Sequence, residues 1–333
     1  MEGASSKEAV KRRGIVYLYG FEWCNPNGDP SFDNEPRIFG EKIFITDVFL
    51  KRRIRDYVYS NCSNTEVFLR EIIKENGKRI TPEERVKELI EDVKDKDLNQ
   101  IKQKLLEKCW DLRVFGFLIP IPGKDEKEEG SSIKSTSIKS IGPTQVSFGI
   151  SLNKVEKIDV TITNVMASKE EKKKGGSIGK KYAVPVAIVE HFIFINDITA
   201  KETNMSEYDY KLLIEALQNL KLAPTLSTSS KNSTPLLIVE IEFCNEKYAN
   251  FFGMLDVKEK VENPLSLRDY EIDTHKLFEK LNELKVNPTS NASNTQQQTQ
   301  TDKEKIINEF KVYIKKEYKD IFKLPQEINP ILF

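Results

Sequence analysis

The sequence predicts an α+β fold whose order of strand, helix, strand, strand, helix, strand matches the split βαβ, ferredoxin-like pattern. Three observations predict it. First, apolar runs typical of strands alternate with two amphipathic helices. Second, charged polar segments interrupt this order as insertions. Third, hydrophobic residues make up 38% of the chain, which suffices for a sizeable core. RNA-recognition modules share this order with unrelated proteins, so the order alone decides no function.

The first strand is expected at 14–23, where GIVYLYGFEW is apolar and aromatic, after a flexible basic arm at 1–13. The loop that follows, CNPNGDPSFDNEPRI, is dense in Asn, Pro, Gly and Asp, the residues that favour turns. A helix then begins, with Thr46 as its N-cap and Asp47 in the first turn, where the helix dipole favours an anion.

This helix, expected from about Thr46 to Ser60, has an apolar face and a basic face. A rotation of about 100° per residue places four apolar residues on one buried stripe: Leu50, Ile54, Tyr57 and Val58. Three cations then share an exposed face, Lys51, Arg52 and Arg55, whereas Arg53 turns toward Tyr57 and is expected to be structural. Such long cationic side chains can contact phosphate oxygens without reading bases. Taken alone, the helix favours the alternative of an ordinary solvated face.

Residues 61–143 are expected to form a mainly helical insertion. One helix starts at TPEERVKELIEDV, with Thr81 as cap and Pro82 at the first helical position, and DLNQIKQKLLEKCW continues in the same style. The charged, Ser-rich segment 123–142 is expected to be a mobile loop.

Strand character returns with TQVSFGISLNKVEKIDVTITNV, and a long hairpin is expected at about 160–184. Its tip, SKEEKKKGGSIGKK, has six lysines against two glutamates, and its glycines allow a close approach of the backbone to a ligand. Such a tip can lie across a nucleic-acid backbone, although a solvated loop is an equally good interpretation of this segment alone.

The second half of the pattern begins with the strand run YAVPVAIVEHFIFIN. The amphipathic helix SEYDYKLLIEALQNL follows, in which Ser206 and Asp209 are spaced like a capping box, and PLLIVEIEF is the last strand. Residues 246–286 complete this part of the fold, 287–302 form a polar low-complexity linker, and 303–333 are expected to be one amphipathic helix.

Composition excludes several classes of protein. Lys+Arg and Asp+Glu both number 52, so any contact with nucleic acid must come from local patches. The four cysteines, Cys24, Cys62, Cys109 and Cys244, lie far apart without a CxxC pair, which argues against a zinc site or a disulfide framework. No apolar run reaches the roughly 18–20 residues of a membrane span, and the first residues lack the core of a signal peptide, so a cytoplasmic protein is expected.

Three carboxylates near the first helix, Asp29, Asp33 and Asp47, could form a metal-dependent nuclease site. The turn around Asp29 and the helix start at Asp47 explain these residues without catalysis. P-loop and GxGxxG patterns are absent, and no cysteine has a neighbouring histidine. We therefore expect no catalytic residue, metal or cofactor.

At NPNGDP, followed by ITDVFLKRRIRDYV, the sequence resembles the Cas seven (Cas7) family, the backbone subunits of type I CRISPR interference complexes (Cascade). The subtype I-B and I-C members are the most similar. Further motifs follow in the family's order: DLRVFG, GPTQVSFGISLNKV, GGSIGKKYAVPVAI, SEYDYKLLIEAL and PLLIVEIEF. The resemblance covers roughly 14–285.

The resemblance implies a hand-shaped protein with an RRM-like palm at 14–60 and 144–245. The insertion at 61–143 would be its helical finger and the hairpin at 160–184 its β-hairpin thumb. Copies would oligomerise into a helical filament along guide crRNA and present the guide for pairing with target DNA. Other partners implied are the Cas five, Cas six and Cas eight subunits, a small subunit and, indirectly, the Cas three nuclease-helicase.

The resemblance also implies the RNA contacts, which are cations and small polar residues of the loop, the first helix and the thumb: Asn25, Asn27, Lys51, Arg52, Arg55, Lys172, Lys173, Lys174, Ser177, Lys180 and Lys181. Two departures remove expected arginines. Ile150 follows Gly149 where the family often has Arg, and LSTSSKNS replaces an Arg-Ser element after the late helix.

Two alternatives remain open. Type III relatives cut RNA with an aspartate in a palm loop, so Asp29 and Asp33 keep a metal-dependent endoribonuclease under consideration. A structural filament protein that needs no nucleic acid is the other alternative.

Overall fold

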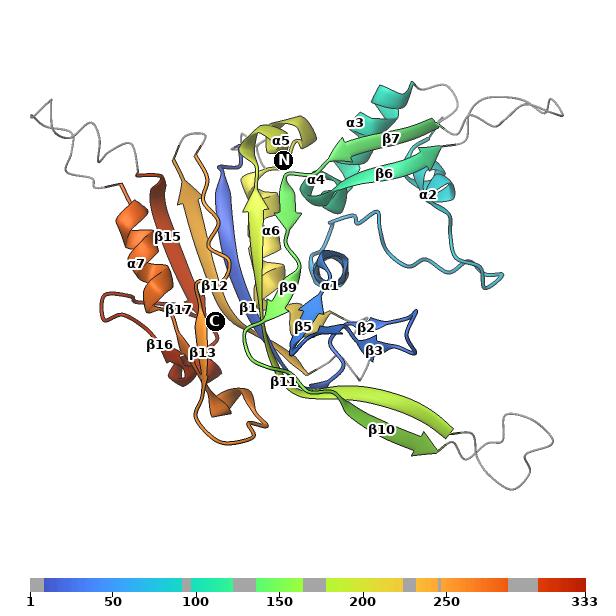
Figure 1. Ribbon diagram of the computed structural model, residues 1–333. Helices are drawn as coiled ribbons and strands as arrows, with labels where there is room; N and C mark the ends of the chain where they lie inside the picture. The colour runs from blue at the N-terminus through green and yellow to red at the C-terminus, as the bar shows by residue number, and fades with distance from the viewer. Residues whose placement is uncertain are drawn as a thin grey trace, which may run out of the picture. The chain divides into compact units, whose positions relative to one another are not determined.

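The computed structural model describes residues 9–91, 97–121, 136–163, 178–223, 232–244, 247–286 and 305–333. The chain is a mixed α/β protein that divides into two compact units (Figure 1). Unit 1 comprises Met1–Arg13, Lys51–Gln145 and Phe194–Leu217, and unit 2 comprises Gly14–Leu50, Val146–Ile193 and Gln218–Phe333.

A large sheet dominates unit 2, with the strand order β17-β15-β12-β1-β11-β9-β5-β4. The central strands are apolar along their length because both of their faces are covered, as β1 illustrates with a continuous buried run from Gly14 to Phe21. The strands are β1 (Arg13–Cys24), β4 (Ile38–Phe39), β5 (Lys42–Ile45), β9 (Gly149–Ser151), β11 (Ile178–Ile195), β12 (Ser233–Phe243), β15 (Ile307–Ile314) and β17 (Ile331–Leu332).

Two further strands join β11. β10 (Ile158–Thr163) pairs antiparallel with its first part, from Ile158 opposite Ala183 to Thr163 opposite Ile178. This pairing confirms the base of the predicted hairpin. β8 (Thr144–Val146) also pairs with β11.

Smaller elements complete unit 2. β13 (Asp256–Glu259), β14 (Tyr270–Asp273) and β16 (Phe322–Lys323) form a three-stranded sheet, and β2 (Gly28–Asp29) pairs with β3 (Glu35–Pro36). The helix α7 (His275–Leu284) lies beside β15 (Figure 1). Three short 3-10 helices are η3 (Leu220–Leu222), η5 (Leu267–Asp269) and η7 (Lys316–Ile321).

Unit 1 is mainly helical. Its helices are most of α1 (Asp47–Asn61), α2 (Pro82–Leu89), α3 (Leu98–Lys108), α4 (Trp110–Phe115), α5 (Asp197–Thr203) and nearly all of α6 (Glu207–Gln218). A hairpin of β6 (Gly116–Ile121) and β7 (Thr136–Ile141) joins them. α2, α3 and this hairpin share an apolar core built from side chains such as Val86, Leu105 and Ile138. No helix in the described ranges is both long and apolar enough to span a bilayer.

Several helix predictions are confirmed. The stripe of α1, Leu50, Ile54, Tyr57 and Val58, is buried. Thr81 and Glu84 form a capping box with Pro82 in the first turn of α2. At the start of α6, the Asp209 amide donates to the Ser206 hydroxyl, and the Asp209 carboxylate accepts from the Ser206 amide.

The predicted helix over 303–333 is wrong. The described part of this segment contains β15, which pairs antiparallel with β12 from Leu237 opposite Ile314 to Phe243 opposite Ile307. Ile307, Val312 and Ile314 are buried. The hydrogen bonds and burial supplied by a strand partner override a local helical pattern, because helix propensity differs by less than about 1 kcal/mol per residue.

The helical structure expected over 61–143 is absent from the segment between α1 and α2. This segment has only isolated bridges, of Glu66 with Cys109 and of Ile73 with Arg79, before α2 begins at Pro82. Its backbone is held by side chains from other elements, which a periodicity argument cannot detect.

Candidate nucleic-acid interface

The loop between β1 and α1 is fixed to the start of the helix by Asn27. The Asn27 Oδ1 accepts hydrogen bonds from the Thr46 amide at 3.0 Å and the Thr46 hydroxyl at 3.1 Å. Thr46 in turn accepts from the Phe49 amide at 3.4 Å, which confirms it as the N-cap. Asn25 is buried and donates to the Asn34 carbonyl at 2.7 Å. Both asparagines therefore position the loop, and their RNA contacts stay a prediction.

The aspartates of the loop have partners of their own. Asp29 forms an ion pair with Arg37 and accepts from the Ser31 amide at 3.0 Å. Asp33 sits in the left-handed backbone region at a φ of 49° and accepts from the Tyr182 hydroxyl at 3.1 Å. Within the described ranges, no group of three or more His, Cys, Asp or Glu side chains is arranged to hold a metal ion.

Two cations of α1 lie where the basic face was expected. Arg52 has 44% of its side chain exposed, and its Nε donates to both carboxylate oxygens of Asp56 at 2.8 Å. Lys51 is half-buried, with its Nζ 6.0 Å from the ring centre of Phe115. The pair joins a carboxylate that is only 5% exposed to a guanidinium group that partly faces solvent.

The prediction that Arg55 shares the exposed face is wrong. Its exposed fraction is 9%, and its Nε donates to Asp111 Oδ2 at 3.1 Å. Its guanidinium carbon lies 4.8 Å from the ring centre of Phe115. Burial lowers the pKa of Arg55, and the charge of Asp111 opposes that shift. Arg55 is therefore first a structural residue, and its contact with RNA stays a prediction.

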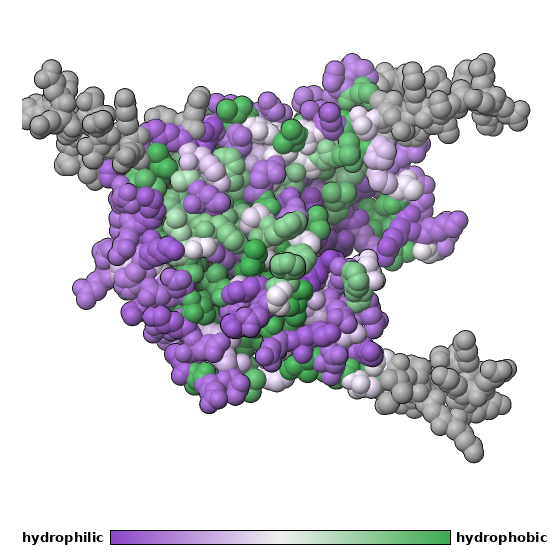
Figure 2. All heavy atoms as spheres, viewed as in Figure 1, coloured by the Kyte–Doolittle hydropathy of each residue, from purple (hydrophilic) through white to green (hydrophobic). Residues whose placement is uncertain are grey.

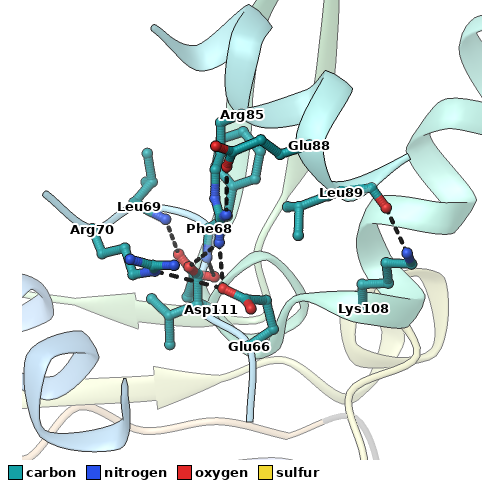
Figure 3. Close-up of polar contacts among 10 residues, drawn as sticks. Glu66, Phe68, Leu69, Arg70, Arg85, Glu88, Leu89, Lys108 and Asp111 are labelled. Carbon is teal, nitrogen blue, oxygen red and sulfur yellow. Dashed lines mark hydrogen bonds and ion pairs between the residues drawn. The ribbon is translucent and has the colours of Figure 1, made fainter. Parts of the chain in front are cut away.

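Asp111, the partner of Arg55, is a residue that the sequence reasoning missed. It is fully buried in α4 and accepts hydrogen bonds from the Phe68 amide at 2.7 Å and the Leu69 amide at 3.0 Å (Figure 3). One carboxylate thus joins α1, α4 and the segment after Glu66. It stands in the motif DLRVFG, but its partners lie 42, 43 and 56 residues away in sequence.

Beside α1, unit 1 contains a pocket of about 410 Å³ in which five of the twelve lining residues are arginines. The lining has five arginines and one carboxylate residue, Glu71, with apolar side chains between them. The arginines are Arg52, Arg55, Arg70, Arg79 and Arg85. The sequence does not indicate that three of these arginines lie together. Arg70, Arg79 and Arg85 are spread over 16 residues, partly in irregular chain and partly in α2, and follow no periodic pattern.

The hairpin of β10 and β11 carries exposed lysines at its base. Lys180 and Lys181 on β11 are exposed and lie opposite Thr161 and Val160. The other predicted thumb contacts, Lys172, Lys173, Lys174 and Ser177, lie outside the described residues.

Ile150, at the position where the resemblance led us to expect arginine, is an apolar surface residue. It pairs with Phe44 across β5 and β9 and is 39% exposed. Phe148 is also exposed, with its ring centre 6.3 Å from that of Phe44. Figure 2 shows hydrophobic side chains at the surface over strands of the large sheet. Ile150 therefore cannot make the phosphate contact that an arginine at this position would make.

Three comparisons with known proteins each find a similar family, protein or structure. A family model described as "CRISPR-associated protein Cas7" matches residues 11–275. The CRISPR-associated protein Cas7 of Haloferax volcanii is 26% identical over 289 residues, which are 82% of this chain and 83% of that protein. A chain of the solved structure "CRISPR RNA-guided surveillance complex, pre-nicking" is similar with a TM-score of 0.46 and 10% identity, over 72% of this chain and 80% of that chain.

Proposed function

Because the chain belongs to the Cas7 family of CRISPR-associated proteins, we propose that it is a backbone subunit of a type I interference complex that binds guide crRNA without sequence preference. The observation that carries the proposal is the cationic surface of unit 1, where Arg52 of α1, the neighbour of Lys51 in sequence, lines a pocket together with four other arginines. Arginine and lysine side chains bind phosphates without reading the base.

The sheet supports the RRM-like palm in this proposal. The strands β1, β9, β11 and β12 follow one another in sequence and lie in the order β12-β1-β11-β9. That order, fourth, first, third, second, is the one that a ferredoxin-like βαββαβ chain produces. The antiparallel hairpin of β10 and β11 agrees with a thumb, and the helices of unit 1 with a finger.

The proposed role is binding and not catalysis. Copies of the chain assemble along the guide as a helical filament and leave its bases to pair with target DNA, together with the other Cascade subunits in the cytoplasm. The ion pair of Asp29 with Arg37 and the bond of Asp33 with Tyr182 support this view, because both aspartates already have structural partners.

A charge-matched pair of variants tests the binding surface. Lys51→Ala/Arg52→Ala removes two cations from α1, and the control Lys102→Ala/Lys104→Ala removes two from α3 of the same unit. We expect the α1 variant to raise the Kd for single-stranded RNA about tenfold and to flatten the salt slope by about 0.7 per lost phosphate contact, with the control close to wild type. Arg55 is not substituted, because its removal would leave the buried carboxylate of Asp111 without its ion-pair partner.

Binding equal to wild type in the α1 variant would contradict this site. Copurification of a protein-only oligomer without nucleic acid would favour the structural filament instead. Cleavage of target RNA with Mg²⁺ by the assembled complex, abolished in Asp29→Ala or Asp33→Ala, would replace the proposal by the endoribonuclease.

A further inference from the structure

The pocket beside α1 is rich in hydrogen-bond donors and poor in acceptors. Its five arginines come from three places in unit 1: Arg52 and Arg55 from α1, Arg70 and Arg79 from the segment between α1 and α2, and Arg85 from α2. Glu71 is the one carboxylate residue in the lining. Two carboxylates outside the lining hold guanidinium groups of the pocket. Glu66 pairs with Arg85 (Figure 3), and Asp111 pairs with Arg55.

The two arginines nearest Glu66 each keep a buried donor without an acceptor. Arg85 is 5% exposed and bonds Glu88 through one terminal nitrogen and Glu66 and the Val67 carbonyl through the other. Its Nε is buried without a hydrogen-bond partner within the described residues, and so is the Nε of Arg70. The closest approach of Arg70 Nε to Glu66 is 3.6 Å, which is beyond hydrogen-bond distance.

The α1 arginines engage their carboxylates with Nε. Arg52 donates from Nε to both oxygens of Asp56, and Arg55 donates from Nε to Asp111. These bonds do not involve the terminal nitrogens of Arg52 and Arg55. A guanidinium group has five N–H donors, so each of these arginines keeps donors that an anion can use.

This donor excess defines the chemistry of a ligand. The two buried Nε atoms are out of reach of a ligand, but an anion with several oxygens can accept from the remaining guanidinium donors, and hydrogen bonds to charged groups contribute roughly 1.5–3 kcal/mol each. The planar guanidinium fork matches phosphate, and the apolar lining of Phe68, Ile80 and Pro82 suits a sugar or a base. The volume of about 410 Å³ lies in the range of small-ligand pockets, roughly 300–1,000 Å³.

We propose that this pocket holds one nucleotide of the single-stranded guide RNA, with its phosphate on Arg70 and Arg79. The assignment rests on the proposed function, since Arg52 belongs both to the pocket and to the basic face of α1. It extends the RNA-binding surface from α1 into the segment before α2. A carboxylate-bearing protein segment is the competing occupant, and the experiment separates the two.

The test measures RNA binding by the full chain with arginines removed from the pocket but not from α1. Arg70→Ala/Arg79→Ala is expected to raise the Kd for single-stranded RNA about tenfold and to flatten the salt slope by about 0.7, the value for one phosphate. The control is Arg268→Ala, which removes an exposed arginine paired with Asp320 as Arg79 is paired with Glu71. The control is expected to bind like wild type.

The single variant Arg79→Ala is expected to fold normally, because 81% of that side chain is exposed. Weaker RNA binding by this variant is therefore not explained by misfolding. RNA substituted with thiouridine and irradiated on the wild-type protein is expected to crosslink to the peptide 68–85. Wild-type protein that binds no RNA would overturn the proposed function. Normal RNA binding by both pocket variants, or crosslinks of the RNA to other peptides without any to 68–85, would overturn the pocket assignment alone.

Discussion

At the scale of single residues, two neighbours on β11 show how burial sets ionisation. Glu190 is fully buried, accepts from the Gly253 amide at 2.9 Å, and has its other oxygen buried without a partner within the described ranges. Burial raises the pKa of Glu190 to about 7. Burial lowers the pKa of His191 to about 4, so its ring is neutral near pH 7.

Glu190→Gln is expected to stabilise the protein at pH 8 by about 2 kcal/mol and by much less at pH 5. The pKa of Glu190 is raised in the folded state, so wild-type stability is intact below the unfolded pKa of 4.5 and is lost as pH rises toward about 7. Glutamine keeps the acceptor for Gly253 but cannot ionise. Urea unfolding at both pH values measures the difference, and an equal effect at pH 5 and pH 8 would refute the explanation.

Helical periodicity predicted the buried stripe of α1 but not the burial of Arg55. Leu50 and Ile54 recur at the helical spacing, so their positions follow from the local sequence alone. Arg55 is drawn inward by Asp111, which lies 56 residues away, and by the ring of Phe115. The local pattern marked Arg53 as structural but Arg55 as exposed, and only the tertiary partner reveals that Arg55 is buried too.

At the scale of elements, Asp111 fastens α1 and the segment after Glu66 to α4. Asp111→Asn keeps the size of the side chain but removes the charge opposite Arg55 and one acceptor for the amides of Phe68 and Leu69. We expect a loss of about 3 kcal/mol, the usual effect of breaking a buried ion pair. Asp320→Asn, in the exposed pair with Arg268, is the control and is expected to cost less than about 1 kcal/mol.

Chemical denaturation and amide hydrogen exchange measure this effect. Faster exchange at Phe68 and Leu69 in Asp111→Asn is expected, since those amides lose their buried acceptor. A stability change no larger than that of Asp320→Asn would show that the carboxylate does not hold these elements together.

The last strands show why an element can be missed. Phe310, Val312 and Ile314 alternate along β15 as in a half-buried strand, but the same segment also satisfies a helical pattern. The strand conformation is stabilised by β12, whose backbone groups pair with β15, and by α7, whose Phe278 ring centre lies 6.0 Å from that of Phe310. Strand, helix and hairpin predictions elsewhere succeeded where one periodicity was unambiguous, as in β1, α6 and β12.

At the scale of the whole molecule, equal numbers of acidic and basic residues place any RNA affinity in local cationic surfaces. Binding is expected to weaken steeply with salt, with a slope of about −0.7 per neutralised phosphate on a single strand. The mass of the complex in sedimentation is expected to grow in steps as the RNA is lengthened. A single fixed mass on all lengths, or a Kd insensitive to salt, would contradict phosphate-driven assembly.

The edge strands of the large sheet determine whether two copies of the chain can pair through their sheets. Both outermost strands, β4 and β17, have two residues each. The start of β15 is covered too, because the Val286 amide donates to the Ile307 carbonyl at 2.9 Å. Two-residue outer strands offer little backbone of their own for edge-to-edge pairing, the usual route to amyloid-like growth, although β17 pairs with only Tyr313 and Ile314 of β15. In the proposed assembly along RNA, these edges would therefore limit backbone pairing between the sheets of neighbouring copies.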